Sequence, residues 1–71
     1  MENELTVYRA KHDLTQEALA MEVGVTRQTI NALEAERYDP SLELAFKLAE
    51  HFECSIEDLF TYEGEQDRDG K

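Results

Sequence analysis

The segment VTRQTINALE, residues 25–34, concentrates side chains that can hydrogen-bond at two points at once. A guanidinium group presents a planar fork of donors, and a carboxamide presents a donor beside an acceptor. Arg27, Gln28 and Asn31 are of these two kinds. In the major groove of DNA an arginine fork matches O6 and N7 of guanine, and an amide matches N6 and N7 of adenine. The chemistry open to this segment is therefore base recognition, provided that a helix presents the three side chains together.

The acidity of the whole chain opposes that chemistry unless the charge is unevenly distributed. The 71 residues include 17 acids and 7 lysines or arginines, a formal net charge of -10. Binding to a duplex relies on basic groups that displace counterions, so an even spread of acids would repel it. No acid occurs between Glu22 and Glu34, however, whereas residues 38–62 carry six acids and one base. The acids therefore accumulate away from the polar segment, and they do not forbid DNA binding.

Length and composition bound the class of protein. Seventy-one residues make one small domain, close to the lower limit for folding without a disulfide or a metal. Cys54 is the only cysteine, which excludes an intrachain disulfide and a CxxC-type metal site. No apolar run approaches the roughly 20 residues that span a bilayer, and the first residues do not resemble a signal peptide. We expect a cytoplasmic protein without cofactor or metal, and no catalytic set can be assembled from these residues.

Apolar spacing predicts helices throughout and no sheet, because sustained alternation of apolar and polar residues is absent. The expected helices cover about residues 3–12, 16–23, 27–35, 41–52 and 56–61. Residues that can cap their N-termini are Thr15, Thr26, either Asp39 or Ser41, and Ser55 with Asp58 as a capping box. Gly24 ends the second helix, since glycine readily takes the left-handed conformation found there. Pro40 ends any continuation of the third.

The apolar positions of these helices predict the core. The expected inward residues are Leu5, Tyr8 and His12 in the first helix, Leu19, Ala20 and Val23 in the second, Ile30 and Leu33 in the third, and Ile56, Leu59 and Phe60 in the fifth. The fourth helix is apolar on more than one side, so we expect it to be central, with Leu42, Phe46 and Phe52 all in the core. After Tyr62 the chain is polar. We therefore expect a folded domain over residues 1–62 and a disordered acidic tail over residues 63–71.

Residues 16–34 have the pattern of two helices that cross closely through a tight turn. Seven positions are of the required type: Leu19, Ala20, Val23, Gly24, Val25, Ile30 and Leu33. With LTQEALA, VGVTRQTINALE, YDPSLELAFKLAEHF and CSIEDLF, the chain resembles the Cro and lambdoid-repressor (XRE-type) class of helix-turn-helix regulators over about residues 4–62, especially short single-domain bacterial and archaeal members. The resemblance implies an all-α, compact five-helix bundle of the lambda-repressor-like type. It also implies a sequence-specific transcriptional regulator, by expectation a repressor.

The outward side of the third helix supplies the expected base contacts. Arg27 can take guanine bidentately, and either Gln28 or Asn31 can take adenine. The methyl group of Thr29 or Ala32 can touch thymine. A helix of this length, about 13 to 14 Å at 1.5 Å per residue, fits a major groove.

The resemblance also implies contacts to the DNA backbone and one ion pair. Gln16 begins the second helix, whose free N–H groups and dipole suit a phosphate. The expected backbone-contacting set is Gln16, Thr26, Arg37 and Tyr38, although Tyr38 could instead pack under the domain. Arg9 and Glu34 match positions that the family often joins in a partly buried salt bridge, so we assign both a structural role. Removing one partner of such a pair strands the other charge.

Two residues after the third helix depart from the family pattern. Relatives often have Asn-Gly at the positions of Ala35 and Glu36. Glu36 lacks the ease with which glycine takes positive φ, and it places an acid beside the expected phosphate contact at Arg37. The loop contacts are thus the part of the interface that fits the family least well.

The fifth helix supplies the expected partner surface. Relatives usually dimerise and place two reading helices about 34 Å apart on a palindromic operator. Ile56, Phe60 and Tyr62 are the candidate homodimer interface, and with no second domain we expect no small-molecule ligand. His51 and Cys54 are three positions apart, but two ligands do not close a zinc site. We expect Cys54 to be a buried, inert thiol.

Two explanations of the acidity remain open. The first is a DNA-binding regulator from a salt-loving organism, because in molar salt the Debye length is about 3 Å and distant acids hardly act on DNA. The second is a helix-turn-helix module, antitoxin-like or a regulatory partner, that binds a basic protein through its acidic surface. The two differ in whether the protein binds its own promoter.

Overall fold

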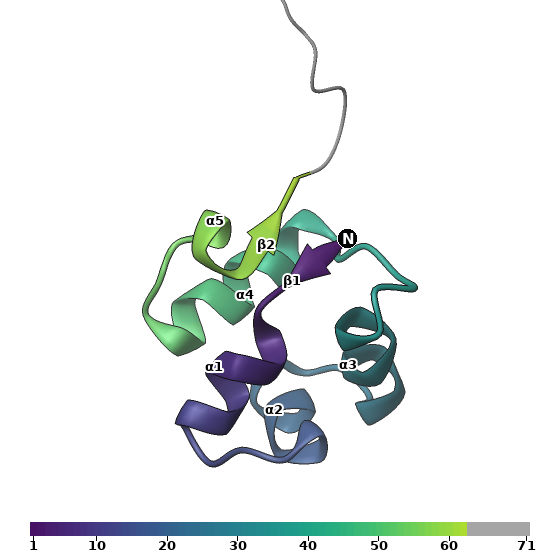
Figure 1. Cartoon of the computed structure of the whole chain (residues 1–71). Helices are drawn as coiled ribbons and strands as arrows, with labels where there is room; N and C mark the ends of the chain where they lie inside the picture. The colour runs from purple at the N-terminus through teal and green to yellow at the C-terminus, as the bar shows by residue number, and fades with distance from the viewer. Residues whose placement is uncertain (63–71) are drawn as a thin grey trace, which may run out of the picture.

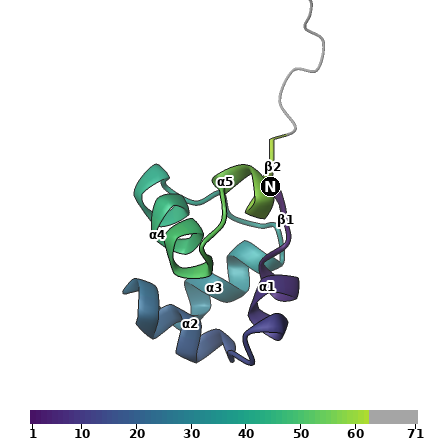
Figure 2. The same ribbon diagram turned by 90° about the vertical axis from the view of Figure 1, so that its left-hand side faces the viewer.

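The computed structural model describes residues 1–62, so the tail expected over residues 63–71 lies outside the described residues. Its elements, in chain order, are β1 (Glu2–Asn3), α1 (Leu5–Lys11), α2 (Gln16–Val23), α3 (Arg27–Glu34), α4 (Leu42–Phe52), α5 (Ile56–Leu59) and β2 (Phe60–Thr61). The helices pack as one small bundle, with α2 at the end opposite the two strands (Figures 1 and 2). The all-α, five-helix expectation is confirmed, and no helix within residues 1–62 is long and apolar enough to cross a membrane.

Every helix contributes at least one fully buried side chain to a single core. The fully buried set is Leu5, Leu19, Ile30, Leu33, Leu48 and Leu59. Around it lie the other buried residues Ala20, Val23, Leu44, Ala45, Ala49, Phe52 and Phe60. Because each helix is short, this shared burial is what stabilises them, as helices of this length are marginal in isolation.

Side-chain caps start four of the helices where the sequence predicts them. Thr15, Thr26 and Ser41 each accept a hydrogen bond from the backbone N–H three residues on. Of the two candidates before α4, Ser41 is therefore the cap, and Asp39 instead lies 3.1 Å from the amino group of Met1. Ser55 and Asp58 form both halves of the predicted capping box.

Four of the helices end in the same way, but only α2 uses glycine for it. The residues with positive φ at these ends are Asp13, Gly24, Glu36 and Glu53. In each case the following residue donates its N–H to a carbonyl five positions earlier: Leu14 to Arg9, Val25 to Ala20, Arg37 to Ala32, and Cys54 to Ala49. This is the Schellman arrangement, in which the left-handed residue is most often glycine. The three acidic residues therefore each carry a backbone strain of about 1 kcal/mol.

A two-stranded antiparallel sheet, absent from the sequence prediction, ties the two ends of the domain together. Glu2 pairs with Thr61 and Asn3 with Phe60, so α5 ends at Leu59 instead of continuing to residue 61. Because Glu2 and Asn3 belong to the strand, the first helix begins at Leu5, later than expected, and Oδ1 of Asn3 accepts from the backbone N–H of Leu5 at 3.1 Å. Strands of two residues are too short to show a period in the sequence.

The fourth helix is central, as expected, since α4 contributes more buried residues than any other helix, but the expectation that Leu42 and Phe46 lie in the core is wrong. Leu42 and Phe46, one helical turn apart, are 70% and 58% exposed, whereas Phe52 is buried. The other helices cover only one face of α4, so its second apolar stripe faces solvent. His12, expected on the inward face of the first helix, lies just beyond the end of α1 and is exposed, although its ring contacts Phe52 edge-on with centroids 5.0 Å apart.

Candidate nucleic-acid interface

The α2–turn–α3 unit presents one polar helix face to solvent. Ile30 and Leu33 are buried beneath α3, and this turns Arg27, Gln28 and Asn31 outward. Thr29 and Ala32 are half-buried at the edge of the same face. The structure thus brings the five expected base-contacting residues together on one helix of 8 residues.

Arg27 and Gln28 are the two exposed residues of this face that hold no partner. Neither side chain makes a hydrogen bond or an ion pair within residues 1–62. By contrast, the hydroxyl of Thr29 lies 3.1 Å from that of Thr26, whose oxygen also caps α3. The donors of Arg27 and the amide of Gln28 are therefore available to a ligand without breaking an internal bond.

Beneath this face, Arg9 and Glu34 form an ion pair between α1 and α3. Arg9 donates from Nε to Oε2 of Glu34 at 2.8 Å and from Nη2 to Oε1 at 3.2 Å, with 20% and 8% of the two side chains exposed. Arg9 also donates to the carbonyl of Leu14 at 2.9 Å. The pair and this bond therefore tie α1 and the loop after it to the C-terminal end of α3.

Burial alone would raise the pKa of Glu34, but the hydrogen bonds from Arg9 and Gln16 and the charge of Arg9 outweigh it. The pKa of Glu34 consequently lies below its ordinary value. The same bond to Glu34 raises the pKa of Arg9 despite its burial. Both groups are thus ionised throughout the neutral range.

Gln16 connects this ion pair to the exposed face. Its Nε2 donates to Oε1 of Glu34 at 3.0 Å, and its Oε1 accepts from Nδ2 of Asn31 at 3.5 Å. Oδ1 of Asn31 accepts from Nη2 of Arg37 at 3.4 Å. The structure thereby joins two of the expected backbone-contacting residues, Gln16 and Arg37, through Asn31. Sequence reasoning placed each residue but missed these bonds, because they link positions far apart in the chain.

The loop after α3 carries the remaining expected contacts. Arg37 and Tyr38 are exposed, and Tyr38 does not pack under the domain as a buried residue. Glu36, between Ala35 and Arg37, is exposed with φ 63°. Glu36 therefore adopts a backbone conformation that favours glycine. It is also next in sequence to Arg37, a cation of the candidate interface.

Replacing Glu36 by glycine is expected to raise stability by about 1 kcal/mol and also to strengthen DNA binding, because it removes both the strain and the acid. Glu53→Gly is the matched control, since Glu53 has φ 56° at the end of α4. It should stabilise to the same degree and leave DNA affinity unchanged. Glu36→Gln removes the charge but keeps a side chain at positive φ, so it separates the effect of the charge from the effect of the strain. Urea unfolding measures the change in stability, and DNA titration measures the change in affinity. Equal DNA affinities for all three variants would show that the acid at position 36 does not weaken DNA binding.

The residues expected at a dimer interface occupy two different environments. Phe60 is buried, which confirms its expected place in the core and leaves it no exposed surface for a dimer interface. Ile56 is half-buried and Tyr62 is 77% exposed. Of the three, Ile56 and Tyr62 therefore remain candidates.

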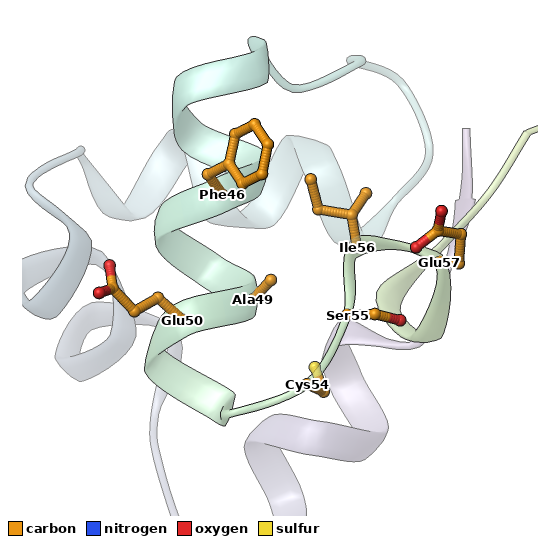
Figure 3. A pocket seen from close by; sticks show the side chains of 7 residues that line it. All are labelled: Phe46, Ala49, Glu50, Cys54, Ser55, Ile56 and Glu57. Carbon is orange, nitrogen blue, oxygen red and sulfur yellow. The ribbon is translucent and has the colours of Figure 1, made fainter.

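Ile56 separates two apolar hollows on the α4–α5 side of the domain. One, of about 660 Å³, lies between Phe46 of α4 and Ile56 at the start of α5, with Ala49 and Cys54 also in its lining (Figure 3). The other, of about 260 Å³, is lined by Met1, Pro40, Leu42, Ala45, Ile56 and Phe60. The exposed stripe of α4 and these hollows form a continuous apolar face, which we call the α4–α5 face.

Cys54 lies at the edge of this face and is half-buried instead of fully buried. Burial raises the pKa of its thiol, and the nearby carboxylate of Asp58 adds to the rise, while a hydrogen bond with Tyr8 opposes it. A raised pKa keeps the thiol protonated and unreactive at neutral pH. Within residues 1–62, no three His, Cys, Asp or Glu side chains gather as metal ligands do, and His51 instead stacks edge-on against Phe52 with ring centroids 5.0 Å apart.

Two helices that cross through a glycine turn, with the second helix presenting unpaired polar side chains, define a helix-turn-helix domain. The model of the helix-turn-helix family matches residues 7–59, and the chain belongs to the Cro/C1-type (XRE) helix-turn-helix family of transcriptional regulators.

Several proteins are similar to this chain over nearly their whole length. An uncharacterized HTH-type transcriptional regulator of Methanocaldococcus jannaschii is 58% identical over 93% of this chain and 100% of its own length. Another from Archaeoglobus fulgidus is 48% identical over 93% of this chain and 94% of its own. A third, from Bacillus subtilis, is 45% identical over 92% of this chain and 98% of its own.

Proposed function

We propose that the protein is a sequence-specific, double-stranded DNA-binding transcriptional regulator that reads the major groove with α3. The single observation that carries this proposal is that Arg27 and Gln28, at the start of α3, are exposed and make no side-chain hydrogen bond or ion pair with any residue from 1 to 62. Arg27 is then assigned to guanine and Gln28 to adenine. Thr29 and Ala32 line the edge of the face, where their methyl groups can reach thymine.

The backbone contacts in this proposal come from both sides of α3. Gln16 stands at the N-terminus of α2, Thr26 at that of α3, and Arg37 and Tyr38 in the loop beyond it. Such contacts fix the register of the helix in the groove, whereas the base contacts supply sequence preference. A small protein seated across a promoter in this way acts most simply as a repressor, by excluding other proteins from the site.

We further propose a homodimer on a palindromic operator, because one helix of 8 residues offers little area for specificity. The α4–α5 face supports this proposal through its exposed Leu42 and Phe46, since contiguous exposed apolar surface of this kind marks interfaces. Tyr62 adds a further ring that is 77% exposed.

The dimer has a direct test in sedimentation. Tyr62→Ser and Phe46→Ser are expected to shift the protein from dimer toward monomer in sedimentation equilibrium at high salt, where acidic copies repel each other least. Met21→Ser is the control, since Met21 is 75% exposed on α2 and lines neither hollow of this face. A wild-type protein that sediments as a monomer at every salt concentration would remove the proposed interface.

The acidic surface fits a regulator that works in concentrated salt. Residues 38–62 carry six of the acids, and none lies within α3 before Glu34. We propose a salt-loving host, where screening over about 3 Å isolates these acids from the DNA and counterion release contributes little. The DNA affinity is then expected to depend only weakly on salt.

A fluorescence titration against DNA from upstream of the protein's own gene tests the function. Preference for this duplex over a shuffled one, with a shallow salt dependence, supports the proposal. A steep fall in affinity between low and molar salt would contradict the proposed salt-loving host but not the proposed DNA-binding function. No binding at any salt would favour a module that binds a basic protein through its acidic surface.

A further inference from the structure

Five side chains form one continuous hydrogen-bonded series that runs from α1 to the loop after α3. In order, the series is Arg9, Glu34, Gln16, Asn31 and Arg37. It begins at the largely buried ion pair and ends on the exposed face. Asn31, in the middle of α3, is thus the one outward amide of the helix whose two ends are both engaged.

The ends of the series determine how both amides are oriented. A carboxylate only accepts hydrogen bonds and a guanidinium only donates them. Glu34 therefore holds the Nε2 side of Gln16, which turns Oε1 of Gln16 toward Asn31. Arg37 in turn requires Oδ1 of Asn31, which leaves Nδ2 for Gln16. From Arg37 through Asn31 and Gln16, each residue donates toward Glu34, and Arg9 donates to Glu34 from the other side. Turning over either amide would therefore break two bonds.

From this arrangement we propose that Asn31 is a positioning residue that holds Gln16 and Arg37 together as a two-point phosphate clamp, and that it does not read a base. This inference rests on the proposed DNA-binding function. To take adenine bidentately, Asn31 would have to present both its N–H and its oxygen to the base and release both neighbours. Gln28, whose side chain has no partner in the described part of the chain, is free to do so.

The clamp consists of the groups that the series leaves unused. One N–H of Gln16 and the remaining donors of the Arg37 guanidinium are free, and both are phosphate-binding groups. The two bonds of Asn31, at 3.5 and 3.4 Å, are long, so each is weak alone. Together they restrict two flexible side chains before DNA binds, and this lowers the entropic cost of contacting a phosphate of the DNA backbone.

A double-mutant cycle distinguishes a positioning residue from a base reader. Asn31→Ala, Arg37→Ala and the double variant are titrated, as the full chain, against the duplex that the wild-type protein enriches from random DNA and against every single-base-pair variant of it. Asn31→Ala should weaken binding about fivefold on all these duplexes alike. Arg37→Ala should weaken it further and reduce the salt slope by about one. The double variant should bind nearly as well as Arg37→Ala alone, since the two residues act as a unit.

Each other outcome decides against the clamp. If Asn31→Ala relaxes the preference at one base pair and its effect adds to that of Arg37→Ala, Asn31 reads a base and the clamp is wrong. If Asn31→Ala binds as tightly as the wild type on every duplex, the series has no part in binding. A wild-type protein without any sequence preference would instead remove the proposed function. Circular dichroism and thermal unfolding show whether the exposed substitutions leave the fold intact.

Discussion

Replacing Glu34 by alanine is expected to lower the free energy of unfolding by about 3 kcal/mol. The substitution strands the charge of Arg9, of which only 20% is exposed, and deprives the amide of Gln16 of its acceptor. Loss of one partner of a buried ion pair costs about 3–5 kcal/mol, and the partial exposure of Arg9 places this pair at the lower end. Urea unfolding followed by circular dichroism measures the change.

Two further variants show whether the stranded charge is the cause. Arg9→Met combined with Glu34→Leu removes both charges, and it should recover most of the stability that either single change loses. If the double variant is less stable by the sum of the two single losses, the two residues are not coupled, and the ion pair is not what holds α1 against α3.

The same pair predicts a dependence of stability on pH. The pKa of Glu34 is lower in the folded protein than its ordinary value of about 4.3, so the unfolded chain binds the proton more readily. The contribution of Glu34 is therefore present above that value and is lost as the pH falls through the folded pKa. The stability difference between wild type and Glu34→Gln should accordingly shrink as the pH is lowered from about 6 toward 2. A constant difference across this range would show that the carboxylate is not stabilised by the fold.

Replacing Arg27 by alanine is expected to abolish the preference for guanine at one base pair of each half-site, at a cost of about 10- to 100-fold in affinity for the preferred duplex. The reason is that Arg27 is exposed, has no side-chain partner among the described residues, and stands at the first position of α3. Titrations against single-base-pair variants of the preferred duplex measure the loss at each position. The matching variant Gln28→Ala should relax an adenine position instead.

Arg27→Lys is the informative control, because it keeps the charge but not the planar fork. If charge alone mattered, Arg27→Lys would bind like the wild type and Arg27→Ala would weaken all duplexes equally. That pattern would place Arg27 on a phosphate and leave the guanine assignment without support.

The sequence predicted most reliably those features that depend on neighbouring residues. Gln16–Val23 has the predicted bounds because Thr15 caps its start and Gly24 takes positive φ at its end. The capping box of Ser55 with Asp58 likewise depends only on local spacing. The face of α3 followed from the burial of Ile30 and Leu33, which period alone predicts.

Features that depend on distant parts of the chain were not predictable in this way. The pairing of Asn3 with Phe60 joins two segments that show no strand pattern of their own. The exposure of Phe46 depends on how far the other helices reach around α4, which its apolar character does not reveal. Likewise, the bonds of Asn31 depend on where Gln16 and Arg37 lie after folding. Composition identifies an amide that can read a base, but only the structure shows that its two ends are already engaged.

The central claim, that α3 reads DNA sequence, is tested most directly by selection from a pool of random double-stranded DNA with the purified full-length protein, at low and at molar salt. We predict enrichment of one palindromic motif whose half-sites lie about one helical turn apart, with the same motif recovered at both salts and its guanine preference lost at one base pair of each half-site with Arg27→Ala. Recovery of no motif, or of the same motif with Arg27→Ala, would contradict the claim.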